Sequence, residues 1–244
     1  MWLGWIDRLL AANVDGIDLR ISAHGTLTDE PLAYGFNEPV VEEYRQRYGV
    51  DIRSQAYDAD RLSRLRGERY TAFVRECSRR VRKLGKRLQV HVHTEAFRPN
   101  PCHGRLMGLP TNIHFDWQAW LSDNLADAIT LRLSWFEAME DPLSARAQRS
   151  RLPGALDDPV VEEALALTAR KKLPVYLNRY IGRAVGIDEY VSDLERIYHD
   201  QRFAGFDIYE FADFARPDQN GKIVPIGNWT ERLRAKTKEL GIAQ

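Results

Sequence analysis

The sequence predicts an α/β fold of the TIM (β/α)8 type, present as an incomplete barrel of about five βα units. Three observations indicate this fold. Five short segments alternate apolar and polar residues, each segment follows an amphipathic helical segment, and the long loops come after these segments. The predicted strands are residues 16–22, 88–95, 128–134, 174–179 and 205–210.

In the first half of the chain, helices separate the first two predicted strands. Residues 2–12 form an amphipathic helix that leads into the first strand. Pro39 opens the next helix, at a position where its missing N–H does no harm, and Gly49 ends it. A longer helix runs over residues 60–84, and Gly85 caps it.

In the second half, shorter helices precede each strand. They cover residues 116–125, 159–171 and 187–199, and a last helix covers 229–240. Lys222 to Ile226 is a weak sixth strand. The long loops are residues 23–38, 96–114 and 141–158, and all of them follow strands. In parallel α/β folds, such loops build the site at the carboxyl ends of the strands.

Charged residues on the strand faces favour a barrel over a doubly wound sheet, whose strands are covered on both faces and are close to uniformly apolar. A complete barrel needs eight strands. We therefore expect residues 1–244 to form a single partial barrel domain. Either further βα units precede it in a longer chain, or a homo-oligomer supplies the missing strands.

Composition excludes some partners. Lys plus Arg and Asp plus Glu each number 35, so the formal net charge is zero and favours neither nucleic acid nor an anionic membrane. No segment has the length of a membrane span or the pattern of a signal peptide. The chain as written therefore predicts a cytoplasmic protein, whereas a longer native chain would leave export open. We expect Cys77 to be buried in a helix and Cys102 to lie in a loop, without a disulfide.

Two glutamates at predicted strand ends are the candidate catalytic carboxylates. Glu95 ends the second strand and Glu210 ends the fifth. Glycoside hydrolysis uses such a pair, one to protonate the leaving oxygen and one as nucleophile or base. The alternative for Glu95 is an exposed strand end or an ion pair with Arg20 or Arg132.

Glu38 is a third candidate carboxylate. It lies in the tripeptide Asn37-Glu38-Pro39, which also occurs around the acid/base of many barrel glycosidases. There the tripeptide stands at a strand tip, whereas here it stands at a predicted helix start. The interpretation as a helix start, with Asn37 as the cap and Glu38 near the positive helix end, is therefore preferred.

His91 and His93 lie on one face of the second predicted strand. Two such imidazoles suit a metal-dependent hydrolase, but a catalytic zinc needs a third protein ligand and no later strand supplies a histidine. We therefore favour hydrogen bonding to substrate or packing in the barrel interior, and predict no metal. No phosphate-binding loop, nucleophile elbow or zinc-type cysteine pattern is present, so we predict no cofactor.

The remaining polar residues on these strands and loops are candidate substrate-binding groups. We expect Arg20 and Arg132 to pair with interior carboxylates such as Asp18, and Trp135 to stack on a sugar ring. The predicted substrate-binding residues are Arg20, Ser22, His24, His91, His93, Arg132, Trp135 and Asn178.

Four motifs carry a family resemblance. They are residues 15–20 (DGIDLR), 34–41 (YGFNEPVV), 47–52 (RYGVDI) and 65–68 (LRGE). With them, residues 14–135 resemble bacterial family-ten glycosyl hydrolase-like proteins, which are similar to the barrel domain of bacterial beta-galactosidases. The resemblance implies a TIM-barrel, carbohydrate-active enzyme.

In related barrels a carboxylate stands at the tip of the fourth strand, where this chain has Ser22 and His24 if residues 16–22 are that strand. Together, the strand-end glutamates and the family resemblance predict a glycoside hydrolase-like protein. It would act on or bind a carbohydrate through carboxylates at the carboxyl-end face. The alternatives are a metal-dependent hydrolase that uses His91 and His93, and a non-catalytic carbohydrate-binding relative.

Overall fold

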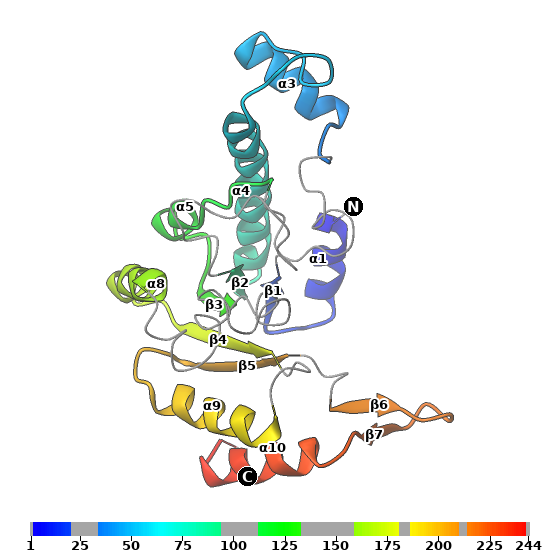
Figure 1. Ribbon diagram of the computed structural model, residues 1–244, viewed down its shortest axis with the longest axis vertical. Helices are drawn as coiled ribbons and strands as arrows, with labels where there is room; N and C mark the ends of the chain where they lie inside the picture. Colours follow the sequence, from blue (N-terminus) through cyan, green and yellow to red (C-terminus); the bar gives the residue numbers. More distant parts are fainter. Residues whose placement is uncertain are drawn as a thin grey trace. The chain divides into compact units, whose positions relative to one another are not determined.

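The computed structural model describes residues 2–20, 34–93, 112–132, 159–180, 186–209 and 214–242 (Figure 1). The chain divides into two compact units, Met1–Ile129 (unit 1) and Thr130–Gln244 (unit 2). The prediction of a single domain over residues 1–244 stays a prediction.

Unit 1 holds two parallel strands and four helices among its described residues. The elements are α1 (Trp2–Ala11), β1 (Gly16–Leu19), α3 (Glu38–Tyr48), α4 (Ala59–Lys83), β2 (Arg87–His93) and α5 (Trp117–Ser122). β1 pairs with β2 so that Ile17 lies opposite Leu88 and Asp18 opposite Gln89. A core cluster of Val41, Tyr44, Ile52, Leu62 and Leu65 joins α3 to α4.

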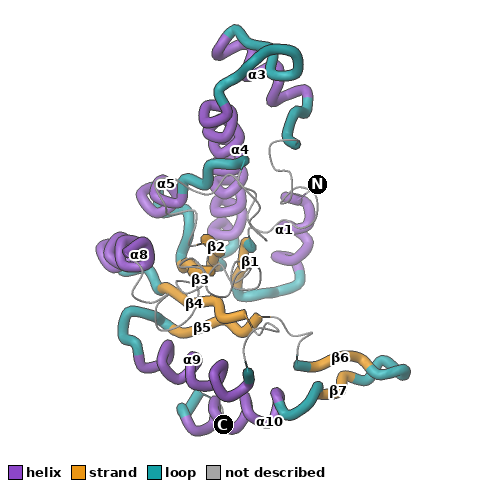
Figure 2. Tube along the Cα trace, viewed as in Figure 1, coloured by secondary structure: helices purple, strands orange, loops and turns teal. Residues whose placement is uncertain are grey.

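Unit 2 repeats the alternation of strand and helix (Figure 2). β3 (Ala128–Arg132) begins at the end of unit 1 and continues here. The other elements are α8 (Pro159–Lys171), β4 (Val175–Tyr180), α9 (Ile187–His199), β5 (Gly205–Tyr209), β6 (Ala215–Pro217), β7 (Ile223–Pro225) and α10 (Trp229–Glu239). β4 and β5 are parallel, and Asn178 lies opposite Asp207.

The strand order identifies the class of sheet. β1 to β5 are hydrogen-bonded neighbours in the order of the sequence. A doubly wound sheet reverses its strand order at a switch point, whereas a barrel keeps the sequence order. The predicted α/β class is confirmed, and the parallel five-stranded sheet is consistent with a partial α/β barrel.

The prediction of Lys222 to Ile226 as a sixth strand of this sheet is wrong. β7 pairs antiparallel with β6 in a separate two-stranded sheet. The reason is local turn chemistry between the two strands. The Asp218 carboxylate accepts from the backbone N–H groups of Asn220 and Lys222, and Gly221 takes φ 78°. This reverses the chain within a few residues, as hairpin turns do.

Several helices end in the same capped turn before the next strand begins. After α4, the N–H of Gly85 donates to the Arg82 carbonyl and that of Lys86 to the Val81 carbonyl, while Gly85 takes φ 67°. This is the Schellman arrangement, which favours glycine because of its left-handed residue. It recurs at Asn124 before β3 and at Lys172 before β4.

The predicted helix ends at Gly49 and Gly85 are confirmed in unit 1. Gly49 ends α3 in the left-handed region, and Gly85 follows the last residues of α4. Cys77 is a free, buried thiol, and its burial raises its pKa to about 12. Cys102 lies outside the described residues. No described helix combines the length and the apolar composition that a bilayer crossing requires.

Candidate functional site

A histidine and a carboxylate meet across the two strands of unit 1. His91 Nε2 lies 2.7 Å from Asp18 Oδ2. The His91 side chain is 8% exposed, and that of Asp18 is 49% exposed. Ionised aspartate only accepts hydrogen bonds, so the hydrogen in this bond belongs to Nε2.

The strand pattern explains why these two side chains meet. In β1, Ile17 is buried while the alternating Asp18 is exposed, as the period of two predicts. In β2, Leu88, Val90 and Val92 are buried on one face and His91 on the other. Asp18 lies opposite Gln89, so His91, two residues further along β2, is its diagonal neighbour.

This geometry corrects the expected partner of Asp18. An arginine, Arg20 or Arg132, was the predicted partner, but among the described residues Asp18 pairs with His91. Arg20 follows β1 and is exposed, whereas Arg132 ends β3 and is buried. Sequence patterns place charges on a strand face but do not reveal which diagonal neighbour a short aspartate can reach.

Unit 2 carries a second strand carboxylate, Asp207. The Thr130 hydroxyl on β3 donates to Asp207 Oδ2 over 2.9 Å. Asn178 on β4 lies opposite Asp207, and its amide nitrogen is 3.4 Å from the Asp207 carbonyl. Thr130 and Asn178 are buried, and Asp207 is half-buried. Sequence reasoning did not select Asp207 as a site residue, because only the strand register of the structure brings it opposite Asn178.

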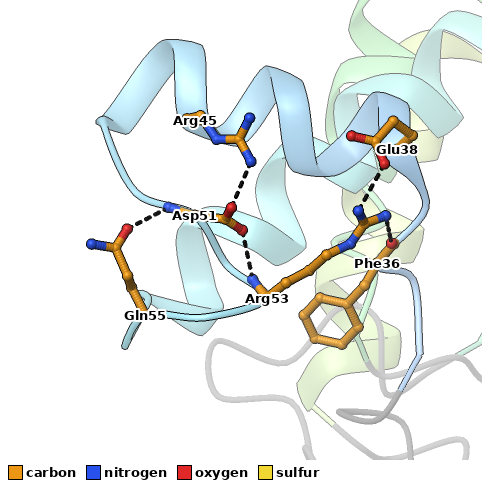
Figure 3. A network of polar contacts seen from close by, with 6 residues as sticks. All are labelled: Phe36, Glu38, Arg45, Asp51, Arg53 and Gln55. Atoms are coloured by element: carbon orange, nitrogen blue, oxygen red, sulfur yellow. Dashed lines mark hydrogen bonds and ion pairs between the residues drawn. The ribbon is translucent and has the colours of Figure 1, made fainter.

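Glu38 lies on the first turn of α3 rather than at a strand end. Arg53 donates from one guanidinium nitrogen to Glu38 Oε2 over 2.7 Å and from the other to the Phe36 carbonyl over 2.8 Å. Figure 3 shows this bridge beside the Asp51 carboxylate, which accepts from Arg45. Glu38 therefore ties the start of α3 to the segment that follows it, at a mostly exposed position.

Several predicted site residues lie outside the part of the chain that the structure describes. They are Ser22, His24, Glu95, Trp135 and Glu210. His93 belongs to the backbone of β2, and its side chain is not described. The predictions for these residues stay predictions.

The described pairs have defined chemical capacities. Asp18 is a hydrogen-bond acceptor held by His91 of the neighbouring strand, Asp207 is an acceptor held by Thr130 of β3, and Asn178 offers an amide. Asp18 and His91 are also potential metal ligands. A catalytic zinc takes three protein ligands, and Asp18 and His91 offer two within unit 1.

No protein-family model, no curated protein and no solved structure matches this chain. The similarity to family-ten glycosyl hydrolase-like proteins therefore stays an expectation from the sequence motifs. Function has to be argued from the residues and their contacts.

Proposed function

We propose that this protein is a glycoside hydrolase-like enzyme that binds and cleaves a carbohydrate with carboxylates near the carboxyl ends of its strands. The observation that carries this proposal is a carboxylate on a parallel strand of each unit, held by a buried polar neighbour. These pairs are Asp18 with His91, and Asp207 with Thr130. Buried polar groups on strands are costly, which favours a binding role over packing.

The roles follow from the chemistry of glycosidic bonds. One carboxylic acid protonates the leaving oxygen, and a carboxylate acts as nucleophile or base. Glu95 is the proposed first catalytic carboxylate. Its partner is Glu210 rather than Glu38, because Glu38 is engaged by Arg53 on α3. Hydroxyl-rich substrates need acceptors and donors. In unit 1, Asp18 supplies an acceptor. In unit 2, Asp207 supplies an acceptor and Asn178 an amide.

The test is turnover of aryl glycosides and oligosaccharides by the purified full chain, with Glu95→Gln and Glu38→Gln as paired variants. Removal of a general acid or base costs about 10²–10⁴-fold in rate. We expect Glu95→Gln to lose activity on that scale and Glu38→Gln to stay near wild type. Equal turnover by wild type and Glu95→Gln would exclude the proposed role of Glu95.

The second candidate is a metal-dependent hydrolase, favoured by the carboxylate beside the imidazole of His91. It predicts a stoichiometric metal in the purified protein and loss of activity with a chelator. Metal-free protein that stays active with chelator excludes it. A non-catalytic carbohydrate-binding protein would bind saccharides in the same panel without cleaving any of them.

A further inference from the structure

We infer that Asp18 is a sugar-contacting carboxylate and that His91 is its positioning residue. The inference rests on the proposed function, because the ligand class comes from there. It adds a substrate contact in unit 1 that the sequence patterns did not select.

The burial of the two side chains determines which of them can reach a ligand. His91 is enclosed, its Nδ1 atom is shielded from solvent, and its Nε2 atom is engaged by Asp18. The imidazole therefore has no ring nitrogen open to a ligand. Half of the Asp18 side chain is exposed, so the carboxylate is the accessible group of the pair.

The hydrogen bond leaves one carboxylate oxygen available. Nε2 engages Oδ2, and among the described residues no group donates to Oδ1 of Asp18. The two residues stand on paired parallel strands, with Asp18 third of the four residues of β1 and His91 in the second half of β2. A binding group gains precision when a packed neighbour on a rigid element orients it.

The chemistry of the open oxygen indicates the ligand. An ionised carboxylate accepts hydrogen bonds and repels anions, so the ligand must present donors and no negative charge at this point. Sugar hydroxyls meet this requirement. His91 acts through Asp18, since its hydrogen bond to one carboxylate oxygen fixes the orientation of the group.

The experiment compares Asp18→Asn with Asp15→Asn in the full chain. Asp15 is exposed and precedes β1, so its variant makes the same change of charge at the opposite end of the strand. The readouts are saccharide affinity by calorimetry and turnover, using the saccharides that the wild type binds or cleaves. Loss of a charge-assisted hydrogen bond lowers affinity about 10–100-fold. We expect this loss for Asp18→Asn and less than about a twofold change for Asp15→Asn.

The role of His91 is tested by rescue with a conservative variant. Glutamine carries an amide N–H near the place of Nε2, whereas phenylalanine fills the site without a donor. We expect His91→Gln to keep most of the affinity and His91→Phe to lose as much as Asp18→Asn, with thermal unfolding confirming that each variant is folded.

Each remaining outcome overturns a defined statement. Wild-type affinity and turnover in Asp18→Asn overturn the inference while the proposed function stands. Wild-type affinity in His91→Phe, or failure of His91→Gln to restore binding, overturns the positioning role. A wild-type chain that neither binds nor cleaves any saccharide overturns the proposed function, and the inference with it.

Discussion

Each unit packs its helices through a cluster of aromatic and aliphatic side chains, but unit 1 also holds its longest helix, α4, through a backbone contact and a buried arginine. In unit 1, a Cβ on Gly67 would lie 2.0 Å from the His114 carbonyl oxygen. In unit 2, Tyr190 and Leu194 pack with Leu233, and Trp229 meets the Tyr190 ring edge-on.

The difference lies in how much each contact can adjust. Side chains in a cluster can change rotamer when a neighbour changes, but two backbones in contact can only separate. Arg66 of unit 1 is equally constrained, because its guanidinium donates to the carbonyls of Tyr34, Gly35 and Asn112. We therefore expect single substitutions at these contacts to lower the free energy of unfolding more in unit 1 than in unit 2.

The largest expected effect comes from Gly67→Ala. The added methyl group must push the segment around His114 away from α4, and we expect a loss of about 2–4 kcal/mol in the free energy of unfolding. The matched control is Gly186→Ala at the start of α9, where no atom lies within 4 Å of a new Cβ. We expect the control to change stability by less than about 1 kcal/mol in urea denaturation. Equal losses in the two variants would remove the contrast between the units.

Arg66→Met should have the next largest effect. Burial lowers the pKa of Arg66, and the acceptors of its guanidinium among the described residues are backbone carbonyls. Its stabilising contribution is therefore the set of hydrogen bonds to backbone carbonyls. A buried carbonyl left without a donor costs up to about 1–3 kcal/mol. For the carbonyls that Arg66 serves, we expect the free energy of unfolding to fall by about 2–3 kcal/mol in total.

The companion variant is Arg66→Lys, which keeps the positive charge but lacks the planar guanidinium group with its several N–H donors. We expect it to recover only part of the lost stability in the same denaturation series. Full recovery of stability by lysine would show that the positive charge stabilises the fold and that the guanidinium geometry does not.

The smallest expected effect is a gain in unit 2. Lys172 occupies the left-handed position after α8, with φ 54°, where unit 1 uses Gly85 after α4. Lys172→Gly should raise the free energy of unfolding by about 0.5–1 kcal/mol, because glycine adopts this conformation without steric cost. Gly85→Ala should lower it by about 1 kcal/mol. Melting temperatures that shift in the same direction for both variants would contradict this prediction.

Helix and strand positions were largely predictable because they depend on local chemistry. Pro39, Gly49 and Gly85 mark helix boundaries, and alternation located the strands near their observed bounds. The register between strands was not predictable in this way. Asp207 was therefore missed, and the partner of Asp18 was assigned to arginine instead of His91.

Gly67 and Arg66 mark the limit of sequence reasoning in the helices. A glycine inside an amphipathic helix gives no sign of the backbone that approaches it. An arginine in an arginine-rich helix resembles its solvated neighbours, such as Arg79, which is exposed. Gly67 is explained by the approach of His114, and Arg66 by carbonyls of Tyr34, Gly35 and Asn112, all of them distant from α4 in the sequence.

The sequence by itself determined the α/β class, the order of the elements, the helix ends and the polar faces of the strands, because periodicity and capping act over a few neighbouring residues. Only the tertiary structure decided which polar groups meet, so that Asp18 pairs with His91 and Asp207 with Thr130. Those outcomes depend on strand register and burial, which arise when distant segments compete for the same partners.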